Sequence, residues 1–140
     1  MTYRARVDRN MFVSMDYVHR QIEKRHSNMV LLDARDANVY TGEVIEFYAP
    51  QPGHIPTARS LPTISIWNAD GTYKSVGELR DMASDVIGRD RNKHIVVYCG
   101  VGGYASSWWY VLAEVLGYRN VSIYDGSAQE WVLYYDMVTD

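Results

Sequence analysis

Short apolar runs alternate with polar segments along the chain and predict buried strands. Residues 29–33 and 94–98 are two such runs, and residues 120–124 form a third. Runs of about five residues that are rich in valine and isoleucine are typical of strands covered on both faces. We therefore expect a strand at each of these positions.

Apolar residues recur at helical spacing in three other segments. Residues 14–26 predict a helix that begins after Ser14, and residues 103–116 predict a long one with an apolar stripe. Ser75 and Glu78 have the spacing of a capping box ahead of a third helix, which Gly88 closes.

Strands that alternate with helices predict an α/β fold, with a central, mainly parallel sheet and helices on both faces. Such sheets bind ligands beyond the carboxyl ends of their strands, where Asp33, Cys99 and Asp125 are expected to lie. Residues 42–62 contain four prolines and predict an irregular cover with little structure of its own.

Length and composition limit the choice of partner and compartment. The 140 residues, 47% of them hydrophobic, are sufficient for one compact domain. A net charge of −3, without a cluster of lysine and arginine, argues against nucleic acid and membrane surfaces as partners. A single cysteine excludes an internal disulfide and, with no signal peptide evident, predicts a reducing compartment, the cytoplasm.

Cys99, the single cysteine, is the strongest candidate for chemistry. It follows the strand 94–98 and precedes a turn containing Gly100, Gly102 and Gly103, which leads into the helix 103–116. A helix N-terminus and a glycine-rich turn direct N–H groups and a positive dipole at their occupant. A thiol there is expected to ionise readily and act as a nucleophile.

Two other interpretations of this turn remain open. A lone cysteine at a strand end is often a small buried hydrophobe. Gly100, Gly102 and Ala105 also fit the dinucleotide fingerprint, with Asp125 after the next strand as the acidic partner, but too little chain follows Asp125 to complete such a site.

Four sequence blocks, found in the expected order, resemble the rhodanese (thiosulfate sulfurtransferase) family. They are Leu31-Leu32-Asp33-Ala34-Arg35, Gly53-His54-Ile55-Pro56 with Ala58, Cys99-Gly100 with Gly102 leading to Ala105-Ser106, and Tyr124-Asp125-Gly126-Ser127 with Glu130-Trp131. Their spacing is most similar to the catalytic second domain of tandem rhodaneses. The single domain can therefore be interpreted as one half of a longer tandem protein.

The resemblance implies a rhodanese-like three-layer fold and sulfur transfer without a metal or cofactor. Cys99 would take sulfur from a donor such as thiosulfate, hold it as a persulfide, and pass it to cyanide or a thiol. Two interpretations of Asp33 and Arg35 stay open: they orient the rim of the site, or the strand-end aspartate pairs with local backbone or a nearby arginine. The loop that binds the substrate would comprise Gly100, Val101, Gly102, Gly103, Tyr104, Ala105 and Ser106.

The sequence also departs from the thiosulfate enzymes of this family. They carry a cationic residue two places after the cysteine and an arginine six places after the strand-end aspartate, where this chain has Val101 and Val39. Both changes weaken the expected binding of a dianion, and Arg35 is the candidate to replace the missing charge. The loop also lacks the arginine that a related phosphatase would need.

Two functions in different classes follow from these departures. The first is an enzyme that turns over small sulfur donors and acceptors. The second is a regulatory rhodanese domain or a sulfur carrier that depends on a protein partner, such as a protein acceptor or an N-terminal rhodanese domain, and that turns over small molecules poorly.

Overall fold

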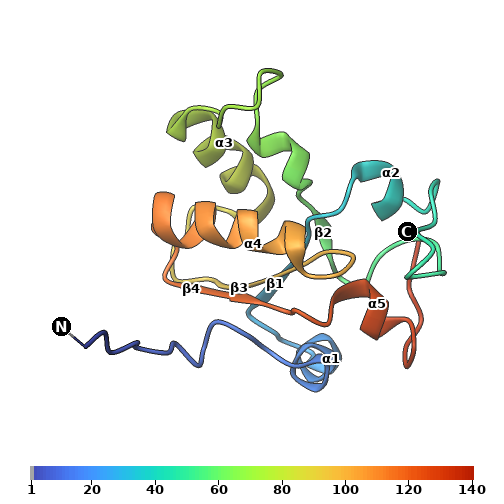
Figure 1. The fold of residues 1–140 in the computed structure, drawn as a ribbon. Coiled ribbons are helices and arrows are strands. Elements are labelled where there is room, and N and C mark those ends of the chain that lie inside the picture. Colours follow the sequence, from blue (N-terminus) through green and yellow to red (C-terminus); the bar gives the residue numbers. More distant parts are fainter. Residues whose placement is uncertain (1) are drawn as a thin grey trace.

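The computed structural model describes residues 2–140, and its centre is a four-stranded, all-parallel sheet (Figure 1). The strands are ordered β2-β1-β3-β4. Parallel pairing aligns Asp33 with Tyr98 at the carboxyl ends of β1 and β3, so the α/β prediction is confirmed. The strands are β1 (Met29–Asp33), β2 (Arg59–Ser60), β3 (His94–Tyr98) and β4 (Asn120–Ile123).

Helices cover both faces of the sheet, as expected for three layers (Figure 1). Val97 and the residues two positions before and after it face one core, which includes residues of α3, α4 and the π-helical η2. Val96 and Tyr98 face the other core, which includes residues of α1 and α5. The helices are α1 (Met15–Glu23), α3 (Val76–Ile87), α4 (Gly103–Tyr110), η2 (Val111–Val115) and α5 (Ser127–Trp131).

The predicted helix caps are present. Ser14 accepts a hydrogen bond from the backbone N–H of Tyr17 at the start of α1. Ser75 and Glu78 form a reciprocal capping box at α3, which ends at Gly88 with φ of +94°. These caps satisfy N–H groups that a helix leaves without intrahelical partners.

The predicted helix 103–116 changes character after Tyr110. Its second part, η2, is π-helical: the N–H of Leu116 donates to Val111 at 2.8 Å, five residues earlier. One extra residue is thereby accommodated in the last turn. Hydrophobic periodicity did not reveal this, because the apolar stripe continues through both parts.

The proline-rich cover contains more structure than the sequence predicted. It includes the two-residue strand β2, which extends the sheet beside β1. A strand this short has no measurable alternation, so periodicity does not detect it. The surrounding segments add α2 (Ala37–Tyr40) and the 3-10 helix η1 (Thr63–Ile66).

The other edge of the sheet is covered by the segment that precedes α1. Phe12 forms a parallel bridge with Ile123 of β4, whose N–H donates to the carbonyl of Met11. This pairing protects the exposed edge of β4. No helix within residues 2–140 combines the length and apolar character needed to span a bilayer.

Candidate active site

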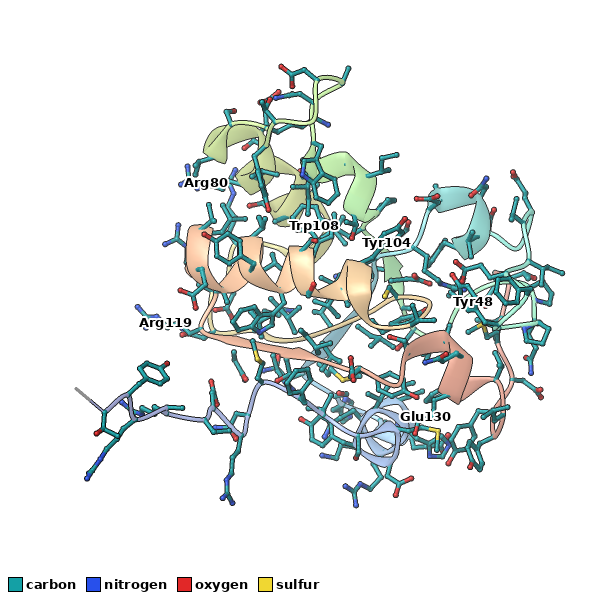
Figure 2. The ribbon with its side chains drawn as sticks, viewed as in Figure 1. Tyr48, Arg80, Tyr104, Trp108, Arg119 and Glu130 are labelled. Atoms are coloured by element: carbon teal, nitrogen blue, oxygen red, sulfur yellow. The ribbon has the colours of Figure 1, made fainter. Side chains whose placement is uncertain are left out.

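Cys99 lies directly after β3, at the carboxyl end of the sheet, and is 2% exposed. Its side chain borders a pocket of about 330 Å³ on the side where Figure 2 labels Tyr48 and Tyr104. Cys99 is thus part of one hydrophobic core and also borders a cavity. The pocket is lined by Asp36, Glu46, Tyr48, Cys99, Gly100, Val101, Gly103 and Tyr104.

The loop after Cys99 turns its backbone around the sulfur atom. The N–H of Gly102 donates to Sγ of Cys99 at 3.0 Å. Gly102 has φ of +98°, and a Cβ there would lie 2.5 Å from Oδ1 of Asp125. Glycine is therefore required both for the backbone conformation and for the close approach of Asp125.

The first turn of α4 begins at Gly103, immediately beyond the sulfur contact. The N–H groups of a first helical turn have no intrahelical acceptors, and the helix dipole is positive at this end. Gly103 and Tyr104 both line the pocket. A negative charge on the outer side of Cys99 Sγ would therefore lie near several donors.

The short helix α5 donates hydrogen bonds to the loop that follows β3. Its N–H groups at Ala128 and Gln129 donate to the carbonyls of Cys99 and Gly100, at 2.9 and 3.1 Å. Ser127 Oγ accepts from the N–H of Cys99 at 3.2 Å and donates to Tyr124 at 2.9 Å. These bonds engage the loop carbonyls and so favour N–H groups facing the pocket.

Ser127 is a positioning residue that sequence reasoning missed. It lies in the block Tyr124–Ser127 that carries the family resemblance, but the sequence alone indicates no role for it. Its φ of +56° is unusual for a residue other than glycine, and the residue is fully buried. Neither property is visible in the sequence.

The predicted loop residues divide into two groups. Gly100, Val101, Gly103 and Tyr104 line the pocket, and Gly102 contacts the sulfur atom. Ala105 is buried in the core instead, and Ser106 is exposed and donates to the carbonyl of Gly103 at 2.7 Å. The side chains of these last two residues are not part of the pocket lining.

Asp33 and Arg35 form a buried ion pair behind the pocket wall. Nη2 of Arg35 lies 2.6 Å from Oδ2 of Asp33 and also donates to the carbonyl of Gly53 at 2.7 Å. The Tyr98 hydroxyl donates to the same carboxylate at 2.6 Å and accepts from the N–H of Ile55 at 3.0 Å. Neither member of the pair lines the pocket.

Glu46 and Tyr48, which sequence reasoning did not single out, form the opposite wall. The Tyr48 hydroxyl donates to Oε1 of Glu46 at 2.6 Å. Burial, followed by this hydrogen bond, raises the pKa of Tyr48 above its ordinary value, so the phenol stays neutral. A Cβ at Gly100 would lie 2.7 Å from the Tyr48 ring, which explains why glycine follows the cysteine.

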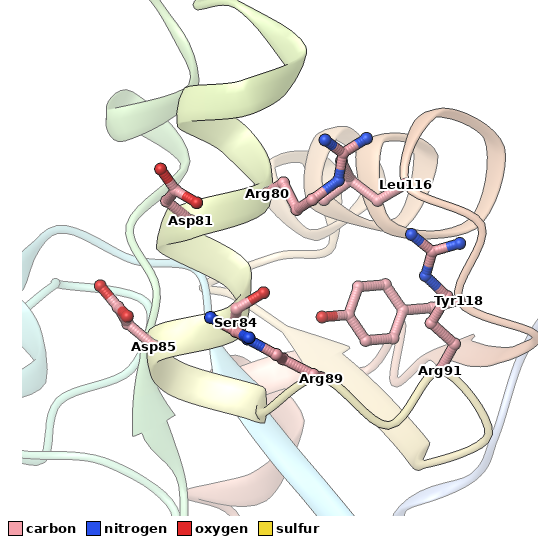
Figure 3. Close-up of a pocket in the computed structure, with 8 residues that line it drawn as sticks. All are labelled: Arg80, Asp81, Ser84, Asp85, Arg89, Arg91, Leu116 and Tyr118. Atoms are coloured by element: carbon pink, nitrogen blue, oxygen red, sulfur yellow. The ribbon is translucent and has the colours of Figure 1, made fainter.

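Three arginines lie together at a different site. A separate pocket of about 600 Å³ is bordered by Arg80, Arg89 and Arg91, with Tyr118 between them (Figure 3). In Figure 2, Arg80 lies on α3, near the end of the α4–η2 segment that is far from Tyr104. This pocket shares no lining residue with the Cys99 pocket.

Other kinds of site find little support. Among the residues that the structure describes, no group of three His, Cys, Asp or Glu is placed to hold a metal ion. In a dinucleotide site, the backbone at Gly100 and Gly102 would approach a pyrophosphate. Here Tyr48 and Asp125 cover those positions.

The cysteine loop, the parallel sheet and the helices on both faces are also found in known proteins. The family model for the rhodanese-like domain matches residues 14–134. The chain belongs to the rhodanese family. Its four resemblance blocks all fall within the matched residues.

Relatives of this rhodanese-like chain carry names from sulfur metabolism. It is 41% identical over 107 residues to a "putative thiosulfate sulfurtransferase" of Mycobacterium leprae, covering 72% of this chain. It is 37% identical over 122 residues to the sulfur carrier protein TtuD of Thermus thermophilus, covering 83% of this chain. The matches span only 38% and 42% of those relatives.

Solved structures share the fold. The anaerobic ergothioneine biosynthesis enzyme of Chlorobium limicola, in complex with trimethyl histidine, superposes with a TM-score of 0.77 at 26% identity. The match covers 93% of this chain and 33% of the enzyme. A structure of EanB with a cysteine persulfide, bound to ergothioneine, also has a TM-score of 0.77 at 26% identity and covers 91% of this chain and 32% of that one.

Proposed function

We propose that this rhodanese-like domain transfers sulfane sulfur through a persulfide on Cys99. The observation that carries the proposal is the hydrogen bond from the Gly102 N–H to Cys99 Sγ, in a pocket at the N-terminus of α4. This geometry stabilises a thiolate first and a persulfide anion afterwards. The names of the relatives and the persulfide in EanB support the same chemistry.

Two displacement steps complete the reaction. The Cys99 thiolate attacks the outer sulfur of thiosulfate, forming an S–S bond to Cys99 while the bond within thiosulfate breaks and sulfite leaves with the electron pair. A nucleophile such as cyanide or a thiolate then attacks the outer sulfur of the persulfide, and the Cys99 thiolate leaves. Neither step needs a proton to be transferred, and none of the described residues that line the pocket is a histidine.

A sulfur carrier is the second candidate function. One of the relatives is named a sulfur carrier protein. Among the described residues, the lining of the Cys99 pocket includes two acidic ones, Asp36 and Glu46, and no lysine or arginine. Such a site favours slow exchange with small dianions and transfer to a partner. The identity of the sulfur donor and of the acceptor, and the involvement of any second domain, are likewise part of the proposal.

Intact mass spectrometry tests the intermediate directly. The protein is incubated with thiosulfate or with inorganic polysulfide, and the mass is compared with that of Cys99→Ser. The chain has one cysteine, so every added sulfur atom reports on Cys99. We expect one added sulfur atom on the wild type, none on the variant, and loss of that sulfur after cyanide is added.

The control separates failure of chemistry from failure of folding. An alkylating reagent under denaturing conditions checks that the thiol is reduced, and circular dichroism checks the fold of Cys99→Ser. A reduced, folded protein that takes no sulfur from either donor would overturn the proposal. Repeated turnover with thiosulfate and cyanide favours the enzyme, whereas a single stoichiometric transfer favours the carrier.

A further inference from the structure

We propose, on the basis of the persulfide function above, that the Cys99 pocket selects sulfur acceptors that carry a positive charge. We further propose that Glu46 is the main determinant of this selectivity. The acceptor class is a small thiol with an ammonium or similar cation a few bonds from its sulfur.

The charge of the pocket lining is the first argument. Asp36 and Glu46 contribute carboxylates to the lining. None of the lining residues within the described range 2–140 is a lysine or an arginine. The persulfide on Cys99 would add a further negative charge. An anionic acceptor therefore approaches several charges of its own sign, whereas a cationic acceptor is attracted by them.

An unsatisfied oxygen of Glu46 is the second argument. Oε1 accepts from Tyr48, but Oε2 is buried and accepts no hydrogen bond from any residue that the structure describes. Nη1 of Arg35 lies 3.6 Å from Oε2, within ion-pair range but too far for a hydrogen bond. No hydrogen bond disperses the charge of this buried oxygen, so the Glu46 carboxylate attracts a cation held in the pocket through its charge rather than through a contact at Oε2.

Arg35 does not neutralise the pocket, because Asp33 already engages it. Its Nη2 is 2.6 Å from Asp33, closer than its Nη1 is to Glu46. The side chain of Arg35 is 2% exposed, so a ligand in the pocket does not reach the guanidinium. The charge presented to a ligand is therefore that of Glu46, whose side chain is 18% exposed.

Aromatic rings at the pocket provide the third argument. Tyr48 and Tyr104 both line it, and Tyr104 is 58% exposed at its mouth. The faces of tyrosine rings attract cations, most strongly where carboxylates lie nearby and water is partly excluded. The pocket thus combines rings and carboxylates, a pairing suited to an organic cation.

The chemical step is the second displacement of the proposed reaction. The acceptor thiolate attacks the outer sulfur of the Cys99 persulfide, and a new S–S bond forms on the acceptor. The S–S bond to Cys99 breaks, and its electron pair stays on Cys99 as the thiolate. The cation takes no part in the bond changes, and its attraction to the Glu46 carboxylate holds the attacking sulfur near the persulfide.

Three thiols that differ mainly in charge test the inference: cysteamine, 2-mercaptoethanol and 3-mercaptopropionate. Cys99 is loaded with inorganic polysulfide, the excess is removed, and loss of the added sulfur is followed by mass spectrometry with each thiol. The rate ratio of cysteamine to 3-mercaptopropionate is compared between wild type and Glu46→Gln. Intrinsic differences among the thiols cancel in that comparison.

We expect the ratio to fall about tenfold in Glu46→Gln, the effect of removing one nearby charge in a partly shielded pocket. Asp36→Asn, at an exposed position of the lining, should lower it less. Glu43→Gln is the matched control, because Glu43 is exposed and does not line the pocket. The rate with 2-mercaptoethanol, which is neutral, should change least.

The outcomes separate this inference from the proposed function. If Cys99 accepts no sulfur, the proposed function fails and the selectivity is wrong with it. If Cys99 loads and discharges but the ratio is the same in wild type, Glu46→Gln and Asp36→Asn, only the inference is overturned. Should Glu46→Gln fail to fold, Asp36→Asn and the ionic-strength dependence of the wild-type ratio decide: an unchanged ratio in both contradicts the inference.

Discussion

Arg35 and Asp33 face each other in a buried ion pair, with Nη2 and Oδ2 2.6 Å apart and side-chain exposures of 2% and 0%. Burial lowers the pKa of Arg35, but the hydrogen bonds and the charge of Asp33 outweigh it, so the pKa lies above its ordinary value. Through Gly53 and Glu46, the pair joins the end of β1 to the irregular cover. The main effect of this ion pair is therefore to stabilise the fold.

Removing one partner of this pair should destabilise the fold strongly. Arg35→Met leaves the carboxylate of Asp33 buried without its counter-ion, and such losses cost about 3–5 kcal/mol. We expect the free energy of unfolding in urea to fall by that amount. Asp33→Asn should also destabilise the fold, because Asp33 accepts from Arg35 and Tyr98.

A double variant checks the cause. Arg35→Met combined with Asp33→Asn removes both charges, so it should cost less than the sum of the two single changes. Additive losses would contradict the ion-pair explanation and indicate that each side chain contributes through packing alone.

The two adjacent glycines Gly102 and Gly103 should respond differently to alanine. In Gly102→Ala the Cβ conflicts with Asp125 and the positive φ is strained, so we expect a loss of about 1–3 kcal/mol. Loading of sulfur on Cys99 should slow about tenfold or more, because the N–H donor at Sγ moves. Mass spectrometry and urea unfolding measure the two effects.

Gly103→Ala is the matched control for this prediction. Nothing lies within 4 Å of a Cβ at Gly103, and the residue is already in α4. Its stability should be unchanged or rise by up to about 1 kcal/mol, as for alanine replacing glycine in a helix. Equal slowing of sulfur loading in both variants would argue against a specific role for the Gly102 N–H.

His94 should make the fold less stable in mild acid. Burial lowers the pKa of His94 below its ordinary value of 6.5, and the Tyr17 hydroxyl lies 3.1 Å from Nδ1. The unfolded chain therefore binds a proton at higher pH than the folded protein does. The contribution of the neutral His94 side chain to stability is complete above about pH 6.5 and is lost as the pH falls below that value.

Urea unfolding between pH 7.5 and 5 measures this dependence. We expect the decrease in free energy of unfolding to be smaller in His94→Gln than in wild type, because the titrating group is gone. His26→Gln, at an exposed position, is the control and should keep the wild-type slope. An identical slope in wild type and His94→Gln would show that His94 does not cause the loss of stability in mild acid.

Local patterns were sufficient to predict the layers of this fold. The apolar runs at β1 and β3 and the capping box of α3 are properties of short segments, and all three are present. Strand β2 and helix α5 were missed because each is too short to show a period. The π-helical turn η2 depends on packing that the stripe of apolar residues does not specify.

The site was predictable where its chemistry is local and unpredictable where it depends on distant residues. Cys99 and Gly102 are three positions apart, so one motif contains both. Glu46 and Tyr48 come from the proline-rich cover and reach Gly100 only in three dimensions. Similarly, Arg35 was the candidate to replace a missing cation, and only the structure shows how tightly Asp33 engages it.

Val101 and Val39 stand where thiosulfate enzymes carry cations. Replacing each valine by a cationic residue should have a different effect at the two positions. Val101 is 50% exposed and lines the Cys99 pocket, so Val101→Lys adds a cation without burying it. We expect its kcat/KM for thiosulfate with cyanide to rise about tenfold, since the added charge attracts a dianion. Val39 is 7% exposed in α2, so Val39→Arg should chiefly destabilise the fold. Val101→Gln, similar in length to lysine but neutral, is the control, and an equal gain in that variant would mean that charge is not what limits the use of thiosulfate.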